Sequence, residues 1–287
     1  MKAVGRFIVT GGASGIGKAT VEAMLGRGDS VGVIDLNPAS LEALGAEHGT
    51  AVAEGRLAAA RADVSSEPEM EAAITGFAET FGGLDGIVNN AAVGGAFGPL
   101  TDLRVEDWDA TFAVVTRGVF IGVKHVARIL IAQGTGGSIV SVGSAAGMVG
   151  DAAPQAYSAA KAAVIHMSRV FGAELAPHRI AVNTVNPGLI ETPLNPRGRR
   201  RTEESFAAAQ PWPEMGRPEH LAQAILFFTD PRTGFITGEV LSVDGGMTAI
   251  GHRLGTLMGT NSLQYGVTGM NHGMTGRSAV VHDGRQD

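Results

Sequence analysis

Residues 7–35, FIVTGGASGIGKATVEAMLGRGDSVGVID, contain the pattern that decides the fold. Phe7 to Thr10 is a short apolar run typical of a buried strand, and a glycine-rich turn follows it at once. Lys18 to Gly26 has the apolar spacing of a helix, and Ser30 to Ile34 is a second apolar run that ends at Asp35. Strand, helix and strand in this order form one βαβ unit, so the two strands are expected to be parallel.

The glycine turn and Asp35 together predict a dinucleotide site. Glycines let the backbone approach a diphosphate, and the free N–H groups at the start of the next helix, with the positive end of its dipole, hold the anion. Asp35 can accept hydrogen bonds from both ribose hydroxyls of an adenosine and would repel a 2′-phosphate, which favours NAD over NADP. A tight turn without a ligand is the alternative, but an acid about twenty residues further on favours the nucleotide site.

Strands and helices continue to alternate along the rest of the chain. This alternation predicts an α/β fold with a doubly wound parallel sheet and helices on both faces. The helices expected at 105–133 and 156–175 have broad faces of small residues that could pair with symmetry mates and build an oligomer. The expected strands after Asp35 are 58–62, 86–88, 138–142, 180–185 and 239–243, and the other expected helices are 67–81 and 218–228.

Polar residues follow several of these strands. Asp63 could hydrogen-bond an adenine edge, and Asn89 and Asn90 either cap a turn or order the nucleotide pocket. The second use is favoured, because the carboxyl ends of parallel strands meet at the ligand-binding edge of the sheet. A Pro-Gly pair at 187–188 forces a turn, and Thr192 beyond it is expected to reach a carboxamide on the cofactor.

The stretch 144–161, SAAGMVGDAAPQAYSAAK, contains the candidate catalytic groups. Tyr157 and Lys161 are four residues apart, so on a helix they project from one face. A positive charge about 4 Å from a phenol is worth roughly 4 kcal/mol at an effective dielectric of 20, or about three pKa units, which would bring Tyr157 near neutrality as a base. Ser144 follows the strand 138–142 at the same edge. Such a Tyr/Lys pair also occurs by chance on solvated helices.

Composition limits the class of protein. With 287 residues, 44% hydrophobic, and 42 glycines, the chain can bury a large core. A net charge of −6 gives no electrostatic footprint for nucleic acid, and no apolar run is long enough for a membrane span or a signal peptide. The absence of cysteine excludes disulfides and thiolate chemistry. We expect a cytoplasmic protein that binds a small molecule and no metal.

The motifs quoted above resemble those of the short-chain dehydrogenase/reductase family, and the resemblance runs from about Phe7 to Met247. It implies one Rossmann-type domain with seven parallel strands, usually a dimer or tetramer, which transfers a hydride between nicotinamide and an alcohol or carbonyl carbon. It further implies that Tyr157 is the general acid/base, that Lys161 lowers its pKa and binds the nicotinamide ribose, and that Ser144 hydrogen-bonds the substrate oxygen. The matching motifs are TGGASGIG at 10–17, Asp63-Val64, NNAA at 89–92, Ser144 with Tyr157 and Lys161, NPGLIET at 186–192 and VDGG at 243–246.

From this resemblance we expect an NAD-binding catalytic domain at 1–249, a C-terminal extension at 250–287, and a homotetramer or homodimer. The extension is either flexible or covers the pocket with 254–265. The predicted cofactor-binding residues are Gly11, Ser14, Gly15, Ile16, Gly17, Asp35, Leu36, Asp63, Val64, Asn90, Ala91, Tyr157, Lys161, Pro187, Gly188, Ile190 and Thr192.

Two residues depart from the family pattern. Val115 stands where an asparagine usually stabilises a helix bend and positions a water in a proton chain to the lysine. Valine cannot bind that water, so proton exchange is expected to be slower or to use Thr116 or Thr111. Ala92 replaces a usual glycine and adds a methyl group beside the cofactor.

The candidate pocket residues are mainly apolar, which favours a hydrophobic alicyclic, aromatic or steroid-like alcohol or ketone over a sugar phosphate. A proline-rich lid is expected at 193–216, with a short helix at 203–209. The alternatives are an NADPH-dependent ketoreductase and a nucleotide-binding sensor or scaffold with weak catalysis. The pocket candidates are Val93, Phe97, Ala145, Met148, Gln155, Leu189 and Leu194.

Overall fold

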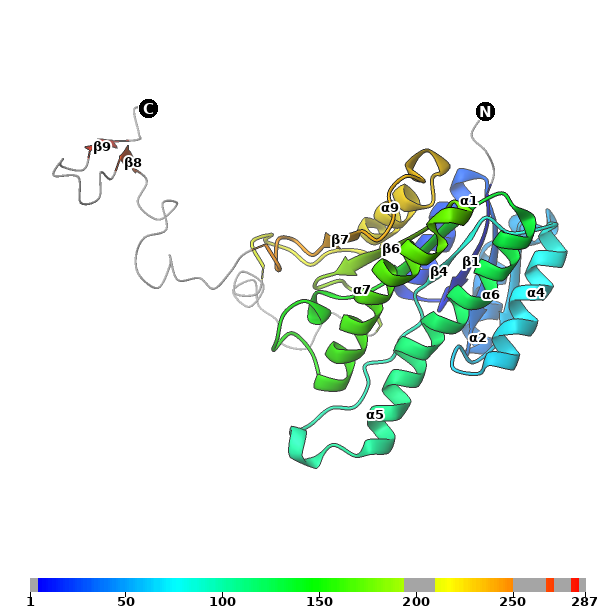
Figure 1. Cartoon of the computed structure of the whole chain (residues 1–287), viewed down its shortest axis with the longest axis horizontal. Helices are drawn as coiled ribbons and strands as arrows, with labels where there is room; N and C mark the ends of the chain where they lie inside the picture. Colours follow the sequence, from blue (N-terminus) through cyan, green and yellow to red (C-terminus); the bar gives the residue numbers. More distant parts are fainter. Residues whose placement is uncertain (1–4, 194–209, 250–266, 271–279, 284–287) are drawn as a thin grey trace. The chain divides into compact units, whose positions relative to one another are not determined.

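The computed structural model describes residues 5–193, 210–249, 267–270 and 280–283. The chain divides into two compact units, residues 1–248 and 249–287. The first unit contains a parallel sheet of seven strands (Figure 1), as the family resemblance implied. The strand order is β3-β2-β1-β4-β5-β6-β7. Its strands are β1 (Arg6–Thr10), β2 (Ser30–Asp35), β3 (Leu57–Arg61), β4 (Gly86–Asn89), β5 (Gly137–Val142), β6 (Ile180–Pro187) and β7 (Val240–Val243).

Helices cover both faces of this sheet and enclose two hydrophobic cores. Ile87 and Ile139 belong to one core, whereas Val88 and Val140 belong to the other, because successive side chains of a strand point to opposite faces. Burial on both faces explains the continuous apolar runs of the strands. The first core packs against α4 (Glu67–Phe81), α6 (Gly118–Gln133) and α7 (Gln155–Leu175), and the second against α1 (Gly15–Arg27), α2 (Pro38–Glu47) and α9 (Pro218–Phe228).

The strand order reverses at β1, which pairs with β2 on one side and with β4 on the other. The chain leaves β1 toward the face covered by α1 and leaves β4 toward the face covered by α6. Open α/β sheets bind ligands beyond the carboxyl ends of the strands at such a reversal, which here is next to β1 and β4.

The structure confirms the predicted helices 67–81 and 218–228 to the residue and corrects the prediction elsewhere. Helix α2 and the short α3 (Gly49–Ala53) were not predicted. Asn37 was the signal for α2, because its Oδ1 accepts from the N–H groups of Ala39 (3.1 Å) and Ser40 (3.3 Å), with Pro38 at the first helical position. The helix expected over 105–133 is α5 (Val105–Phe112), a π-helical turn (Ala113–Arg117) and α6.

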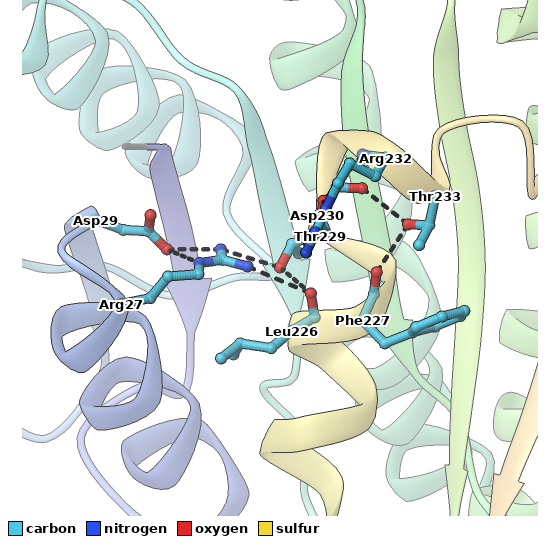
Figure 2. Close-up of polar contacts among 8 residues, drawn as sticks. All are labelled: Arg27, Asp29, Leu226, Phe227, Thr229, Asp230, Arg232 and Thr233. Carbon is cyan, nitrogen blue, oxygen red and sulfur yellow. Dashed lines mark hydrogen bonds and ion pairs between the residues drawn. The ribbon is translucent and has the colours of Figure 1, made fainter. Parts of the chain in front are cut away.

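An arginine joins the far ends of α1 and α9. Figure 2 shows Arg27 between the Asp29 carboxylate, 2.6 Å away, and the C-terminal end of α9. Its guanidinium donates to the Leu226 carbonyl at 3.3 Å and to Thr229 Oγ1 at 3.2 Å. The Asp29 side chain is fully buried and also accepts from the Gly5 N–H at 2.9 Å. A cation near a helix C-terminus interacts favourably with the helix dipole. This contact therefore links the first βαβ unit to α9.

In the second unit, β8 (Val267–Met270) pairs antiparallel with β9 (Val280–Asp283). The lid helix predicted at 203–209, Leu194 and the proposed pocket cover at 254–265 lie outside the described residues. Among the helices that the structure describes, none is long and apolar enough to cross a membrane.

Candidate active site

The turn between β1 and α1 requires glycine at three positions. Gly11 and Gly15 have φ angles of +62° and +52°, which L side chains rarely adopt. A Cβ on Gly17 would stand 2.0 Å from the Gly11 carbonyl oxygen and 2.6 Å from Asn90 Nδ2. The glycines therefore allow the backbone of α1 to approach the backbone of the turn.

Two polar side chains hold this turn against the end of β4. Asn90 Nδ2 donates to the carbonyl oxygens of Thr10 and Gly11, both at 3.0 Å. Thr10 Oγ1 in turn accepts from the N–H groups of Asn90 (3.0 Å) and Ala91 (3.1 Å). Asn90 thus fixes the glycine turn to the end of β4, whereas both polar side-chain atoms of Asn89 are buried without a hydrogen-bond partner among the described residues. Sequence analysis gave Thr10 no role, although its place as the last residue of β1 was the available signal.

The start of α1 fits a diphosphate. The N-cap residue Ser14 is exposed, and its side chain makes no capping hydrogen bond. The first N–H groups of a helix have no intrahelical partner, so those of the turn that includes Ile16 and Gly17 can bind an anion at the positive end of the helix dipole.

The carboxylate of Asp35 is held by two backbone N–H groups. Oδ2 accepts from Ala13 at 3.1 Å, and Oδ1 accepts from Asn37 at 3.0 Å. Each carboxylate oxygen has a second lone pair, so Asp35 can still accept from ribose hydroxyls. Leu36 beside it is 55% exposed and offers an apolar surface at the same edge.

Asp63 and Val64 follow β3 at the next position along this edge. Asp63 Oδ1 accepts from both the N–H and the Oγ of Ser65 at 2.8 Å, so part of its carboxylate stabilises the turn into α4. Val64 is buried and packs against α6, where a Cβ on Gly118 would stand 3.0 Å from its side chain. The remaining acceptor capacity of Asp63 is what an adenine amino group can use.

The segment after β6 folds back toward the glycine turn. The Gly188 N–H donates to the Val243 carbonyl at 3.1 Å. A Cβ on Gly188 would stand 2.6 Å from Asp244 Cα, which explains the glycine after Pro187. Thr192 lies beside the turn, with its Cβ 3.5 Å from the place of a Cβ on Gly15. Ile190, between them, is 4% exposed.

Ser144, Tyr157 and Lys161 come together at the carboxyl end of β5. Tyr157 and Lys161 are in the first two turns of α7, and Lys161 Nζ lies 5.7 Å from the centre of the Tyr157 ring. Nζ also donates to the carbonyl oxygen of Val142, the last residue of β5, at 2.5 Å. Ser144, two residues later, is hydrogen-bonded to Tyr157 and accepts from the Ala146 N–H at 3.1 Å.

The protonation equilibria differ from the sequence-based expectation. Burial raises the pKa of Tyr157 above its ordinary value, and the hydrogen bond with Ser144 offsets only part of this effect. Burial also lowers the pKa of Lys161 to about 8. The expected lowering of the pKa of Tyr157 by Lys161 is not found, because the ammonium is directed at the Val142 carbonyl and is itself poorly solvated.

Val115 is fully buried in the core on the π-helical turn. The helix therefore has an irregular turn here without an asparagine side chain. The two threonines considered for a proton route donate to backbone carbonyls, Thr116 to Ala160 at 3.3 Å and Thr111 to Asp107 at 2.7 Å. Thr116 thus contacts the residue immediately before Lys161, whereas Thr111 supports the loop at Ala96 through an N–H contact of 2.9 Å.

The predicted pocket residues differ in exposure. Val93, Phe97 and Met148 are 41%, 83% and 50% exposed, whereas Ala145 is only 2% exposed. Gln155 Nε2 donates to the Gly98 carbonyl at 3.2 Å, so it joins the start of α7 to the loop at Gly98. A cavity of about 350 Å³, the β6–β7 cavity, lies beyond the ends of these strands and is lined by Leu189, Trp212, His220, Ser242, Asp244 and Gly245, among others. Trp212 was not among the predicted pocket residues.

Known proteins resemble this chain over most of its length. A family model described as enoyl-(acyl carrier protein) reductase matches residues 11–248. A 2,5-dichloro-2,5-cyclohexadiene-1,4-diol dehydrogenase of Sphingobium indicum is 37% identical over 247 residues, covering 85% of this chain and 97% of that protein.

The chain belongs to the short-chain dehydrogenase/reductase family.

Two further relatives extend the comparison for this short-chain dehydrogenase/reductase. A cis-4-hydroxycyclohexanecarboxylate dehydrogenase of Sinomonas cyclohexanicum is 37% identical over 243 residues, 85% of this chain and 96% of that protein. The crystal structure of levodione reductase superposes with a TM-score of 0.79 at 30% identity, covering 85% of this chain and 98% of that one. The protein is an oxidoreductase that acts on small alcohols or carbonyl compounds with a nicotinamide cofactor.

Proposed function

We propose that this enzyme interconverts hydrophobic alicyclic secondary alcohols and their ketones, with NAD as cofactor. The proposal rests on one observation: the Ser144 hydroxyl, the Tyr157 phenol and the Lys161 ammonium lie close together at the carboxyl end of β5. Two of the similar proteins described above act, by their names, on ring alcohols. The exposed apolar side chains of Val93, Phe97 and Met148 suit such a substrate.

Tyr157 is the proposed general acid/base. It takes the hydroxyl proton of an alcohol or returns a proton to a carbonyl oxygen, while Ser144 donates a hydrogen bond to that oxygen as charge develops on it. A bound nicotinamide supplies the hydride acceptor or donor. Because burial raises the pKa of Tyr157, the phenolate needs a nearby positive charge. Lys161 is the proposed source of that charge below about pH 8, once its ammonium turns from the Val142 carbonyl toward Tyr157, and it is also the proposed contact to the nicotinamide ribose.

The proposed NAD site follows the ends of β1, β2, β3, β4 and β6. Gly11, Ser14, Gly15, Ile16 and Gly17 would hold the diphosphate, and Asp35 and Leu36 the adenosine ribose and its surroundings. Asp63 and Val64 would hold the adenine, with Asn90 and Ala91 behind the nicotinamide side. The loop with Pro187, Gly188, Ile190 and Thr192 would hold the carboxamide end. NAD is proposed over NADP because a 2′-phosphate would meet the Asp35 carboxylate, which two N–H groups fix in place.

The decisive experiment compares the two cofactors with ring and open-chain alcohols. Purified protein is mixed with NAD or NADP and with cyclohexanol, cyclohexane-1,4-diol or 2-propanol, and the absorbance of the reduced cofactor is followed. We expect kcat/KM to favour NAD by about 100-fold, the size of one close charge repulsion, and to favour the ring alcohols. An Asp35→Ser variant should lose most of the cofactor preference.

Two outcomes would contradict the proposal. Preference for NADP with intact Asp35 would favour the NADPH-dependent ketoreductase. Tight NAD binding without turnover of any alcohol or of the matching ketones would favour the nucleotide-binding sensor.

We also propose that residues 1–249 are the catalytic domain and that the chain assembles as a homodimer or homotetramer through α6 and α7. Phe120 and Ile131 on α6 and Val170 on α7 leave 44%, 41% and 49% of their surface exposed, which supports a contact there. Light scattering after gel filtration measures the assembly, and a monomer would contradict it. The cysteine-free composition is compatible with the cytoplasm, the proposed location.

A further inference from the structure

Ser144 and Met148 belong to one short turn after β5. The turn Ala145–Gly147 is closed by the Ser144 side chain, which accepts from the Ala146 N–H, and by the Met148 N–H, which donates to the Ala145 carbonyl at 2.9 Å. The position of the Met148 backbone is therefore fixed relative to the hydroxyl that is proposed to hold the substrate oxygen.

The thioether of Met148 receives two hydrogen bonds from neighbouring strands. Asn186 Nδ2 on β6 donates to Met148 Sδ at 3.0 Å, and Ser242 Oγ on β7 donates to the same sulfur at 3.7 Å. Methionine has three rotatable side-chain bonds and usually adapts its shape to what it contacts. These two donors restrict that freedom, although the side chain is half exposed.

The buried amide of Asn186 is expected to lower the stability of the folded protein. It is fully buried, and its Oδ1 has no hydrogen-bond partner among the described residues. The same oxygen lies so close to Gly143 that a Cβ on that glycine would be 2.0 Å away. A buried acceptor without a partner destabilises the folded state, whereas an apolar group of similar shape would not. The amide is therefore not explained as a stabilising group. It is better explained by the hydrogen bond from its Nδ2 to the Met148 sulfur.

Ser242 connects Met148 to the β6–β7 cavity, because it lines that cavity and donates to the sulfur. Met148 thus belongs to the turn with Ser144 and contacts a residue that lines an open space of about 350 Å³. We propose that Met148, held by Asn186 and Ser242, is a specificity-determining residue that closes the reaction site toward this cavity and limits the size of the ring that can react. This inference rests on the proposed function.

Kinetic measurements with a small and a bulky ring alcohol test the inference. The probes are cyclohexanol and 4-tert-butylcyclohexanol with saturating NAD, and the quantity compared is the ratio of kcat/KM for the bulky to the small alcohol. We expect this ratio to rise about tenfold in Met148→Ala, the discrimination typical of a small change in an apolar pocket. In Ser242→Ala it should rise about threefold, the equivalent of one modest hydrogen bond, because the thioether itself remains. The changes should appear mainly in the KM of the bulky alcohol.

A double variant distinguishes a contact through Met148 from a direct effect of Ser242. In the Met148→Ala background, Ser242→Ala should produce no further change in the ratio, because the group it holds is absent. Equal effects of Ser242→Ala in both backgrounds would overturn the inference. Ser40→Ala, which removes the same hydroxyl from α2, is the matched control and should leave the ratio unchanged.

A spectroscopic measurement tests the same contact without turnover. In protein labelled with ¹³C at the methionine methyl groups, the Met148 signal is assigned by its loss in Met148→Leu. Ser242→Ala should move this signal toward the position of a freely rotating methionine, and Ser40→Ala should not. An unchanged signal in Ser242→Ala would overturn the contact. A moved signal with an unchanged kinetic ratio would overturn the role in specificity.

The two readouts separate this inference from the proposed function. If the unmodified enzyme oxidised neither ring alcohol, the proposed substrate class would be wrong. The methyl signal would still decide whether Asn186 and Ser242 hold Met148.

Discussion

The glycine turn after β1 and the turn after β5 lie at the same edge of one sheet, yet the polar side chains around them differ in how many hydrogen bonds they make. Around the glycine turn, Thr10, Asp35 and Asn90 each make at least two hydrogen bonds within the chain. Around the turn after β5, Asn186 Oδ1 and Thr184 Oγ1 are buried without a hydrogen-bond partner among the described residues, as are both polar side-chain atoms of Asn89 at the end of the neighbouring β4. Burial also lowers the pKa of Lys161 to about 8.

The difference corresponds to two tasks. A site for a large cofactor benefits from a rigid frame, because the frame is ordered before the ligand binds and the binding cost falls. A site for proton transfer needs titratable groups in a poorly solvated environment, where pKa values move away from those in water. The first arrangement stabilises the fold, and the second destabilises it locally.

The largest expected effect comes from removing the phenolic hydroxyl on the catalytic side. Tyr157→Phe should lower kcat by about 10³-fold, since positioned acid/base groups contribute roughly 10²–10⁴. The melting temperature should stay the same or rise, because the hydroxyl is poorly solvated in the fold. Turnover that survives Tyr157→Phe would exclude the mechanism.

On the cofactor side, adding a single methyl group should disrupt the glycine turn. Gly17→Ala places a Cβ 2.0 Å from the Gly11 carbonyl oxygen, so the turn must move. We expect the free energy of unfolding to fall by about 3 kcal/mol and NAD binding, measured by calorimetry, to weaken. A Cβ on Gly26, in the same helix, meets nothing within 4 Å. Gly26→Ala should therefore stabilise the protein by about 0.5–1 kcal/mol, and equal destabilisation by both variants would contradict this account.

The frame extends to the far end of α1. Arg27→Met leaves the fully buried Asp29 carboxylate without its cation (Figure 2). Urea unfolding should show a loss of about 2–3 kcal/mol, with the KM for NAD unchanged. Arg232→Met breaks the exposed ion pair with Asp230 and should leave the midpoint nearly unchanged. A change in KM without a change in stability would refute the structural role of Arg27.

The smallest effect concerns pH and the catalytic side. In the folded protein the pKa of Lys161 is about 8, against 10.5 for an unperturbed lysine. Between these values the unfolded chain binds more protons than the folded one, so the free energy of unfolding rises with pH. For this one group the rise is about 2 kcal/mol between pH 7 and 9.5. Urea unfolding of Lys161→Met at both pH values should lack that rise, and an identical pH dependence in both proteins would show that Lys161 is not poorly solvated.

The sequence was sufficient wherever a local pattern has one physical solution. The glycine turn between two apolar runs, with Asp35 after the second, allowed the βαβ unit and its ligand edge to be predicted, and α4 and α9 were found to the residue. It failed between Asp35 and β3, where the Asn37 cap was the signal for α2. It also missed Thr10, whose role depends on hydrogen bonds to residues about eighty positions away.

By itself, the sequence determined the order of strands and helices, the glycine turn, Asp35 and the spacing of Ser144, Tyr157 and Lys161, because these depend on neighbouring residues and on helix and strand periodicity. Only the tertiary structure decided that burial, and not Lys161, dominates the pKa of Tyr157, that the helix around Val115 has a π-helical turn, and that Asn186 and Ser242 meet at Met148. Solvation and contacts between distant strands arise only when the chain has folded, and no local pattern encodes them.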